Sequence, residues 1–223
     1  DKSVKPVRII YEVLVQNINT LIDDPNNHDP VTTMLNIMTT LFSREVDILT
    51  RASEIHHRLK NRNEALDLLD RALALSPKTI GLYVKKGSLL MESLLQVPAA
   101  LKVFHDALAI DVTNKVVLQK RAHCCVLHNP PKLNDAVETY QNILKIHSDD
   151  LQSWNNLVYI EALRGNFTKA LERVDAALEK FPNSITLLQN KVLILKKLED
   201  TQQVDSILTT ILSLEPFNDF ALH

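Results

Sequence analysis

Glycine is scarce in this chain, and its scarcity excludes several kinds of nucleotide-binding site. The 223 residues contain three glycines, Gly81, Gly87 and Gly165, which form no cluster. Phosphate-binding loops and dinucleotide-binding turns need several glycines within a few residues, because the backbone must approach the phosphates closely. We therefore expect no nucleotide site of these types and no other cofactor.

Cysteine is also rare, and the two in the chain, Cys124 and Cys125, are adjacent. A disulfide framework needs spaced pairs, so the sequence favours a reducing compartment and a cytoplasmic location. Cys124 and His128 have the spacing of one helix face, but a zinc site uses four ligands and no complementary pair occurs elsewhere. We predict no metal site and no catalytic Cys–His pair, since nothing in the sequence would activate the thiol.

Net charge and long apolar runs are both lacking, which argues against nucleic acid and membrane. The formal net charge is −2 and charged residues make up 23% of the chain, so no broad basic surface is expected. No apolar run approaches the roughly 18 residues that span a bilayer. We therefore predict no nucleic-acid partner and no membrane insertion. The chain begins without Met, which suggests a processed chain or a fragment.

What the chain does contain is an internal repeat of 34 to 36 residues. Two anchor residues, mostly alanine and seven positions apart, recur five times, and a larger apolar or aromatic residue follows the first anchor by four positions. Small side chains at a fixed helical spacing let two helices cross closely. Each unit is therefore predicted to be a pair of amphipathic helices that bury their apolar faces by stacking on neighbours. The anchors are Ala65 and Ala72, Ala100 and Ala107, Ala136 and Ile143, Ala170 and Ala177, and Val204 and Ile211.

The pattern resembles the tetratricopeptide repeat (TPR), as seen in the fourth unit at Trp154, Leu157, Gly165, Ala170, Ala177 and Pro182. The resemblance covers residues 46–216 and implies an all-α fold, a right-handed α-solenoid of stacked helix-turn-helix repeats. Residues 1–45 are interpreted as an N-terminal helical cap or degenerate repeat, and residues 217–223 as the start of a further unit or a truncated cap. The five repeats are placed at about 46–79, 80–114, 115–150, 151–184 and 185–216.

Some local features depart from a regular repeat. Asp29 and Pro30 have the composition of a helix start, with Asp29 as the N-cap. The helix that follows them could continue without interruption into the first repeat. Two of the spacings between repeats are longer than the others, which places extra residues in turns near 96–98 and 129–132.

The resemblance implies that the first helix of each repeat lines a concave groove, at positions one, two and five after its bulky opening residue. Primary amides both donate and accept hydrogen bonds, so a row of them could pair with the backbone of an extended peptide. The same side chains could instead be ordinary solvated residues. Thr50 and Glu54 stand where a chaperone-binding clamp for a C-terminal carboxylate would have Lys and Asn, which argues against that clamp. The candidate groove residues are Lys85, Ser88, Gln119, Lys120, His123, Asn155, Asn156, Tyr159, Gln189 and Asn190.

These observations favour a non-catalytic scaffold or adaptor whose groove binds a peptide segment or a helix of a partner protein. No catalytic constellation is apparent, because carboxylate pairs such as Asp149 and Asp150 fall at predicted helix starts, where capping explains them. An alternative is a substrate-recognition or regulatory arm of a larger enzyme of the transferase or hydroxylase type. A third hypothesis is an oligomerising subunit that pairs with a second copy through its N-terminal helices or an exposed C-terminal repeat.

Overall fold

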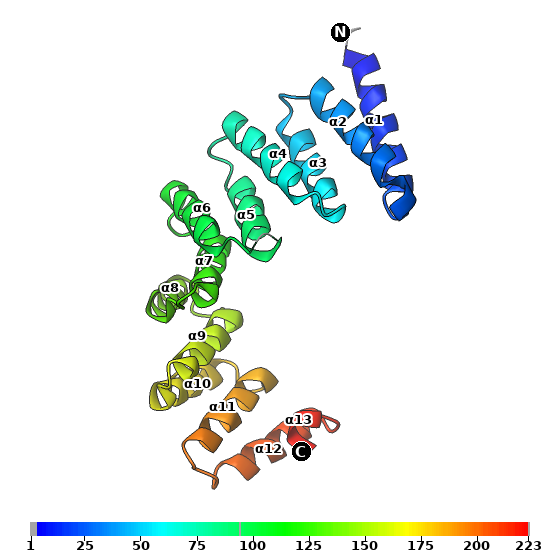
Figure 1. The fold of residues 1–223 in the computed structure, drawn as a ribbon. Helices are drawn as coiled ribbons and strands as arrows, with labels where there is room; N and C mark the ends of the chain where they lie inside the picture. The colour runs from blue at the N-terminus through cyan, green and yellow to red at the C-terminus, as the bar shows by residue number, and fades with distance from the viewer. Residues whose placement is uncertain (1–3, 94, 223) are drawn as a thin grey trace. The chain divides into compact units, whose positions relative to one another are not determined.

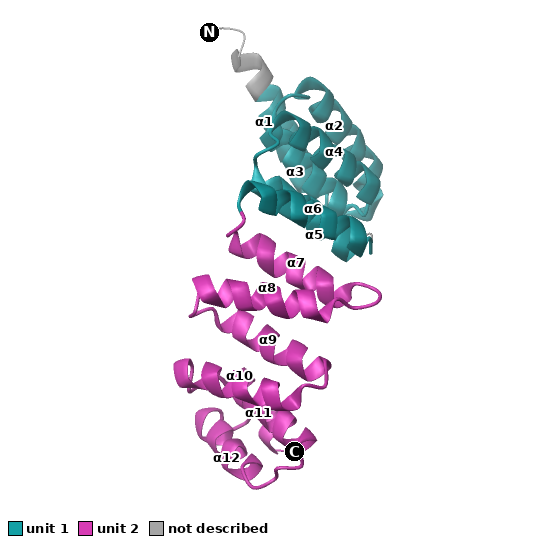
Figure 2. Ribbon diagram, turned by 90° about the vertical axis from the view of Figure 1, so that its left-hand side faces the viewer, with its two compact units in different colours: residues 1–111 teal, residues 112–223 magenta. Residues whose placement is uncertain are grey.

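The structure, a computed structural model, describes the backbone of residues 4–93 and 95–222 and the side chains of residues 9–93 and 95–222. All regular elements in these ranges are helices, and they follow one another along the chain (Figure 1). The chain forms two compact units, residues 1–111 and residues 112–223 (Figure 2). Within the described ranges, no helix combines the length and the apolar character needed to cross a membrane. The predicted all-α fold is confirmed.

Unit 1 contains the N-terminal helices and two helix pairs, α3 with α4 and α5 with α6. Each helix from α1 to α6 packs on the next one along the chain, and the pairs make the most extensive contacts. The elements are α1 (Val4–Leu21), the 3-10 helix η1 (Pro25–Asn27), α2 (His28–Leu41), α3 (Val46–Arg58), α4 (Arg62–Leu75), α5 (Ile80–Ser88), the π-helical segment η2 (Leu89–Ser93) and α6 (Val97–Ile110).

Unit 2 contains three further helix pairs and a short final helix. α7 pairs with α8, α9 with α10 and α11 with α12, and α9 also contacts α11. The first helices α9 and α11 are therefore direct neighbours, and α8 packs between α7 and α9 in sequence order. The elements are α7 (Lys115–Leu127), α8 (Leu133–Ile146), α9 (Leu151–Leu163), α10 (Phe167–Lys180), α11 (Ile185–Lys197), α12 (Val204–Leu214) and α13 (Asp219–Leu222).

The anchor residues of the sequence repeat lie buried at the contacts between helices. All the alanine anchors are fully buried, as are Ile143 and Ile211, and Val204 is 5% exposed. The larger residues four positions further on fill the space beside them: Phe104 and Val174 are fully buried. The apolar faces of the helices are thus covered by their neighbours, as the repeat predicts.

Gly87 of α5 shows how close one of these contacts is. A Cβ atom added at Gly87 would lie 2.4 Å from both Cε1 and Cζ of the Phe104 ring. Real Cβ atoms do not approach other carbons so closely, because such a distance is well inside van der Waals contact. The ring of α6 therefore packs directly on the backbone of α5, and glycine leaves the room that it needs.

We expect Gly87→Ala to lower the free energy of unfolding by about 1 kcal/mol. Helix propensity favours alanine over glycine by about 1 kcal/mol, but crowding in a filled core costs about 1–3 kcal/mol. Gly81→Ala is the matched control on the same helix, because a Cβ added there meets nothing within 4 Å. Chemical denaturation should show opposite signs for the two variants. Equal stabilisation of both would contradict the close packing at Gly87.

The helix that follows Pro30 does not continue into the first repeat, so the uninterrupted helix that we considered is wrong. α2 ends at Leu41, and a turn separates it from α3, which begins at Val46. At this break Phe42 leaves the helical conformation and its ring meets that of Tyr11 of α1 edge-on, with centroids 5.6 Å apart. The aromatic contact between α1 and the turn stabilises the break.

The predicted N-cap at Asp29 is also wrong. α2 begins one residue earlier, at His28, so Asp29 lies inside its first turn, where a carboxylate still suits the helix dipole. The N-cap of α2 is Asn27, whose side chain makes no capping hydrogen bond. Asp24 caps the preceding η1, since its Oδ1 accepts a hydrogen bond of 2.9 Å from the backbone N–H of Asn26.

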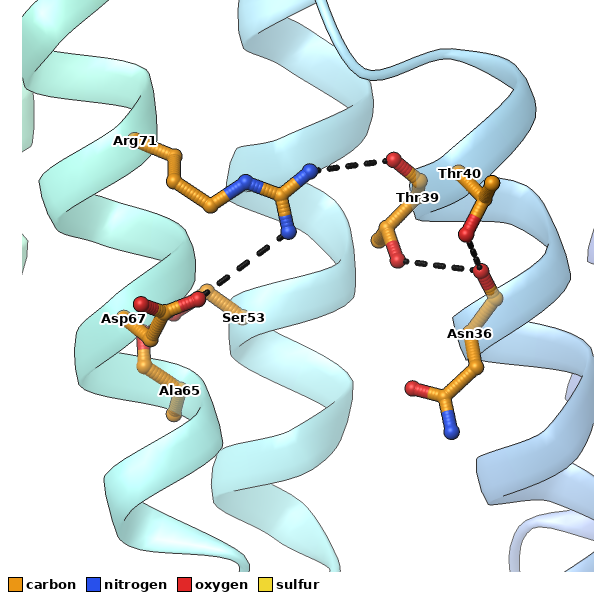
Figure 3. A network of polar contacts seen from close by, with 7 residues as sticks. All are labelled: Asn36, Thr39, Thr40, Ser53, Ala65, Asp67 and Arg71. Carbon is orange, nitrogen blue, oxygen red and sulfur yellow. Dashed lines mark hydrogen bonds and ion pairs between the residues drawn. The ribbon is translucent and has the colours of Figure 1, made fainter.

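Arg71 of α4 links the N-terminal helices to the first helix pair (Figure 3). Its Nη2 donates to the carbonyl oxygen of Thr39 in the last turn of α2 at 3.1 Å, and its Nη1 lies 4.0 Å from Oδ2 of Asp67. Carbonyls in the last turn of a helix lack partners within the helix, so the guanidinium satisfies one of them. Within the pair, Ser53 Oγ of α3 donates to the Ala65 carbonyl of α4 at 2.7 Å in a buried hydrogen bond.

The extra residues of the longer repeats lie in two places, of which sequence spacing predicted one correctly. α7 ends at Leu127 and α8 begins at Leu133, so residues 129–132 form a loop, as expected. In contrast, residues 97 and 98 already belong to α6, which corrects the predicted turn at 96–98. The extra length appears earlier, where α5 passes into the π-helical segment η2, because a π-helical turn accommodates an inserted residue without ending the helix.

Candidate functional site

Most of the predicted groove residues lie on one surface of unit 2, which we call the first-helix face. It comprises the side chains of α7, α9 and α11 that point away from the second helices of each pair. Two hollows lie on this face, one between α7 and α9 and one between α9 and α11. They share α9, whose Asn156 borders the first hollow and whose Tyr159, about one turn further on, borders the second.

The first hollow, the amide pocket, has a volume of about 300 Å³. It brings together four predicted residues, Gln119, Lys120, His123 and Asn156. Asn156 Nδ2 donates to the hydroxyl of Tyr140, a residue of α8, at 3.0 Å. Burial raises the pKa of Tyr140 to about 12, against the opposing effect of this hydrogen bond, so the hydroxyl stays protonated at neutral pH. The full lining is Val116, Gln119, Lys120, His123, Tyr140, Gln152 and Asn156.

The second hollow, the apolar cleft, has a volume of about 340 Å³. Three of its large side chains are half-exposed, at 54% for Tyr159, 48% for Leu163 and 51% for Leu193. Apolar side chains gathered around a hollow and left open to solvent are typical of an interaction site. The full lining is Val158, Tyr159, Ala162, Leu163, Phe167, Asn190, Leu193, Ile194 and Lys197.

The amides of the first-helix face also bond to one another and to neighbouring repeats, which the sequence did not predict. Asn190 Nδ2 of α11 donates to Asn155 Oδ1 of α9 at 3.3 Å. Gln119 Nε2 donates to Asp150 Oδ2 at 3.0 Å, and Gln189 Nε2 donates to the Asn218 side chain at 3.3 Å. These bonds engage one N–H of each donor amide, and a primary amide has a second N–H and two lone pairs.

Asp150 is the N-cap of α9, which confirms the capping role predicted for it. Its Oδ2 accepts a hydrogen bond of 3.2 Å from the backbone N–H of Ser153, and its Oδ1 lies 2.5 Å from Nζ of Lys115. Burial alone would raise the pKa of this carboxyl, but hydrogen bonds from Lys115 and Ser153 together with the Lys115 charge lower it. Asp150 is therefore ionised at neutral pH and fixes the start of α9 beside α7.

The two remaining predicted residues, Lys85 and Ser88, lie in unit 1. They border a smaller pocket of about 190 Å³ with Glu54 of α3. Lys85 Nζ forms an ion pair with Glu54, so its charge is engaged within the unit. The other residues that line this pocket are Ser53, His57, Leu69, Leu89 and Glu92.

Sequence reasoning missed Leu163, Lys197 and Phe167 of the apolar cleft. It examined positions one, two and five after the opening residue of each first helix, whereas Leu163 and Lys197 lie nine positions after it, at the last residues of α9 and α11. A signal was available, because Tyr159 and Leu163 lie one helical turn apart and both are apolar on a surface otherwise rich in amides. Phe167 belongs to a second helix and gave no such signal.

The HCCVLH stretch at 123–128 forms no metal site in the structure. Cys124 and Cys125 are buried and are not joined in a disulfide, and the ring of His128 lies 2.9 Å from the carbonyl oxygen of Pro130. Among the residues that the structure describes, no group of three His, Cys, Asp or Glu side chains could hold a metal ion. Burial raises the pKa of the Cys125 thiol, which disfavours the reactive thiolate.

No protein-family model and no curated protein matches the chain by sequence. Its structure resembles that of YrrB, described as a TPR protein with an unusual peptide-binding site, at 16% identity and a TM-score of 0.62, over 85% of this chain and 96% of that one. It also resembles a TPR protein from Parabacteroides merdae, at 16% identity and a TM-score of 0.68, over 92% of this chain and 79% of that one. PilW, a type IV pilus biogenesis factor, matches at 14% identity and a TM-score of 0.65, over 97% and 96% of the two chains. The chain therefore has the fold of a tetratricopeptide repeat protein.

Proposed function

We propose that this chain is a non-catalytic scaffold that binds an extended peptide segment of a partner protein on the first-helix face of unit 2. The observation that carries the proposal is the position of the apolar cleft beside the amide pocket, with α9 common to both. A peptide lying across α7, α9 and α11 would place a side chain in the cleft while its backbone meets the amides. The cytoplasmic location and the lack of catalysis remain predictions from the sequence.

The apolar cleft would supply most of the binding free energy. Full burial of a Leu or Phe side chain is worth about 1.5–3 kcal/mol, whereas a hydrogen bond that replaces one to water contributes about 0.5–1.5 kcal/mol. The amides would instead fix the position and direction of the peptide, because unpaired backbone groups of a bound segment are costly. YrrB, whose structure resembles this one, is described as having a peptide-binding site, which supports a peptide as the partner.

The test is selection of peptides from a random library displayed on phage against the full chain. Repeated enrichment of peptides that bind with measurable affinity is expected. Loss of this binding in Leu193→Asp is also expected, because a carboxylate in the cleft would be desolvated by the bound side chain. A library that yields no binder, or binders that are insensitive to Leu193→Asp, would overturn the proposal.

We expect the combined variant Asn155→Ala, Asn156→Ala and Asn190→Ala to weaken a selected peptide by about tenfold or more. The loss of one to two net hydrogen bonds accounts for a change of this size. Asn134→Ala with Asn183→Ala is the control, since both residues are exposed and lie outside the first-helix face. Fluorescence anisotropy measures affinity, and circular dichroism checks the fold. Unchanged affinity in a folded triple variant would show that the amides do not contact the peptide.

A further inference from the structure

The first helices of unit 2 carry almost no negative charge. α7, α9 and α11, which the structure describes in full, contain one carboxylate, Glu161. Glu161 is 2% exposed and its Oε2 accepts hydrogen bonds from Arg164 at 2.9 Å and Asn166 at 3.0 Å, so it closes the turn between α9 and α10. The basic residues of the three helices are Lys115, Lys120, Arg121, Lys191, Lys196 and Lys197.

These cations divide between the two sides of the helices. Arg121 donates to Thr139 of α8 at 3.0 Å, and Lys191 pairs with Asp175 of α10 at 2.7 Å, so both point toward second helices. Lys120 and His123 border the amide pocket, and Lys197 borders the apolar cleft. Among the described residues that line these two hollows there is no carboxylate.

This positive character is local and does not follow from the composition of the chain. The net charge is −2, and six of the thirteen carboxylates of unit 2 lie on its second helices. Asp150 lies at the N-terminus of α9, where it pairs with Lys115. The pocket of unit 1 differs in sign, since Glu54 and Glu92 border it with a single Lys85. The carboxylates on the second helices are Asp135, Glu138, Glu172, Asp175, Glu179 and Asp205.

We infer that the segment bound by the first-helix face carries an acidic side chain a few residues from an apolar one. The inference rests on the proposed function. The apolar side chain occupies the cleft at Tyr159 and Leu193, and the carboxylate meets Lys120 and His123 of the amide pocket. The two hollows lie on either side of α9. A helix with its side chains is about 10–12 Å across and an extended chain advances about 3.3 Å per residue, so about three residues separate the two.

The basic residues of this face contribute more to specificity for the partner than to affinity. Exposed ion pairs each contribute little to binding and weaken with salt, so the apolar side chain provides most of the affinity. Complementary charge nevertheless rejects basic segments, because like charges at short range repel. A polyanionic nucleic acid is a poorer fit, since it binds through many basic contacts and this face is half apolar.

The experiment compares the peptides selected by the wild-type chain with those selected by a double variant that carries Lys120→Glu and Lys197→Glu. Lys145→Glu, Lys180→Glu is the matched control, because it makes the same change of net charge at exposed sites on α8 and α10. The wild type and the control should enrich peptides with Asp or Glu about three residues from Leu, Ile or Phe. The double variant Lys120→Glu, Lys197→Glu should bind these acidic peptides about tenfold more weakly at low salt, and its affinity for them should no longer depend on salt.

The outcomes separate this inference from the proposed function. Binders without acidic residues, or acidic binders whose affinity is equal in the two charge variants, would overturn the inference and leave the peptide-binding scaffold intact. The absence of any binder would overturn both. Tighter binding of single-stranded DNA than of every selected peptide would show that the positive face serves a different class of partner.

Discussion

Phe104→Ala is expected to lower the free energy of unfolding by about 3–5 kcal/mol. The ring is fully buried and packs on the backbone of α5 at Gly87. Replacement by alanine removes the transfer free energy of the ring and leaves a cavity, and such changes in cores cost about 3–5 kcal/mol. The surrounding helices cannot collapse into the space easily, because Gly87 offers no side chain to fill it.

Urea denaturation followed by circular dichroism measures this loss. Phe217→Ala is the matched control, because Phe217 is 91% exposed and the same atoms are removed there. The control should change the free energy of unfolding by less than about 0.5 kcal/mol. A loss below about 1 kcal/mol for Phe104→Ala would mean that the ring does not fill the space between α5 and α6.

Ala170→Leu is expected to destabilise unit 2 by about 1–3 kcal/mol. Ala170 is fully buried on α10, in a cluster with Val158 of α9 and Val174 of its own helix. Three added carbons have no room at a close helix crossing, so the helices must separate or the leucine must leave its preferred rotamers. The rest of the repeat depends on this crossing, because α11 packs on the other side of the same pair.

The control for this variant is Lys169→Leu, which places the same side chain one residue earlier at an exposed position. Thermal denaturation of the two variants under the same conditions separates overpacking from any effect of leucine on the helix itself. An unaltered melting temperature for Ala170→Leu would contradict the register of the repeat.

The parts of the fold that were predictable are those set by local and periodic sequence. Ala170 and Ala177 share one helix face whatever lies around them, and Asp150 can cap α9 because its partner, Ser153, is three residues away. The break between α2 and α3 at Phe42 could not be predicted from local sequence, since it depends on contact with Tyr11 of another helix. Local sequence favours a continuous helix there, and tertiary packing decides otherwise.

The candidate site was predicted in part for the same reason. The resemblance to the tetratricopeptide repeat implied that Gln119, Lys120, His123 and Asn156 share a groove, and the structure gathers them in one pocket. The sequence could not show that Gln119 bonds to Asp150 or that Asn190 bonds to Asn155, because these partners lie about a repeat apart along the chain. The sequence also could not predict the apolar cleft, because its shape depends on how α9, α10 and α11 pack.

The amide bonds between repeats bear on how the specificity of this surface could change in evolution. Gln119, Asn190 and Gln189 each fasten one repeat to the next, so a substitution there alters the assembly of the array together with any contact to a ligand. The side chains of Tyr159 and Leu193 are instead half-exposed, so a substitution there removes less buried contact between helices. Divergence between related proteins should therefore concentrate in the cleft, while the amides persist as a shared framework.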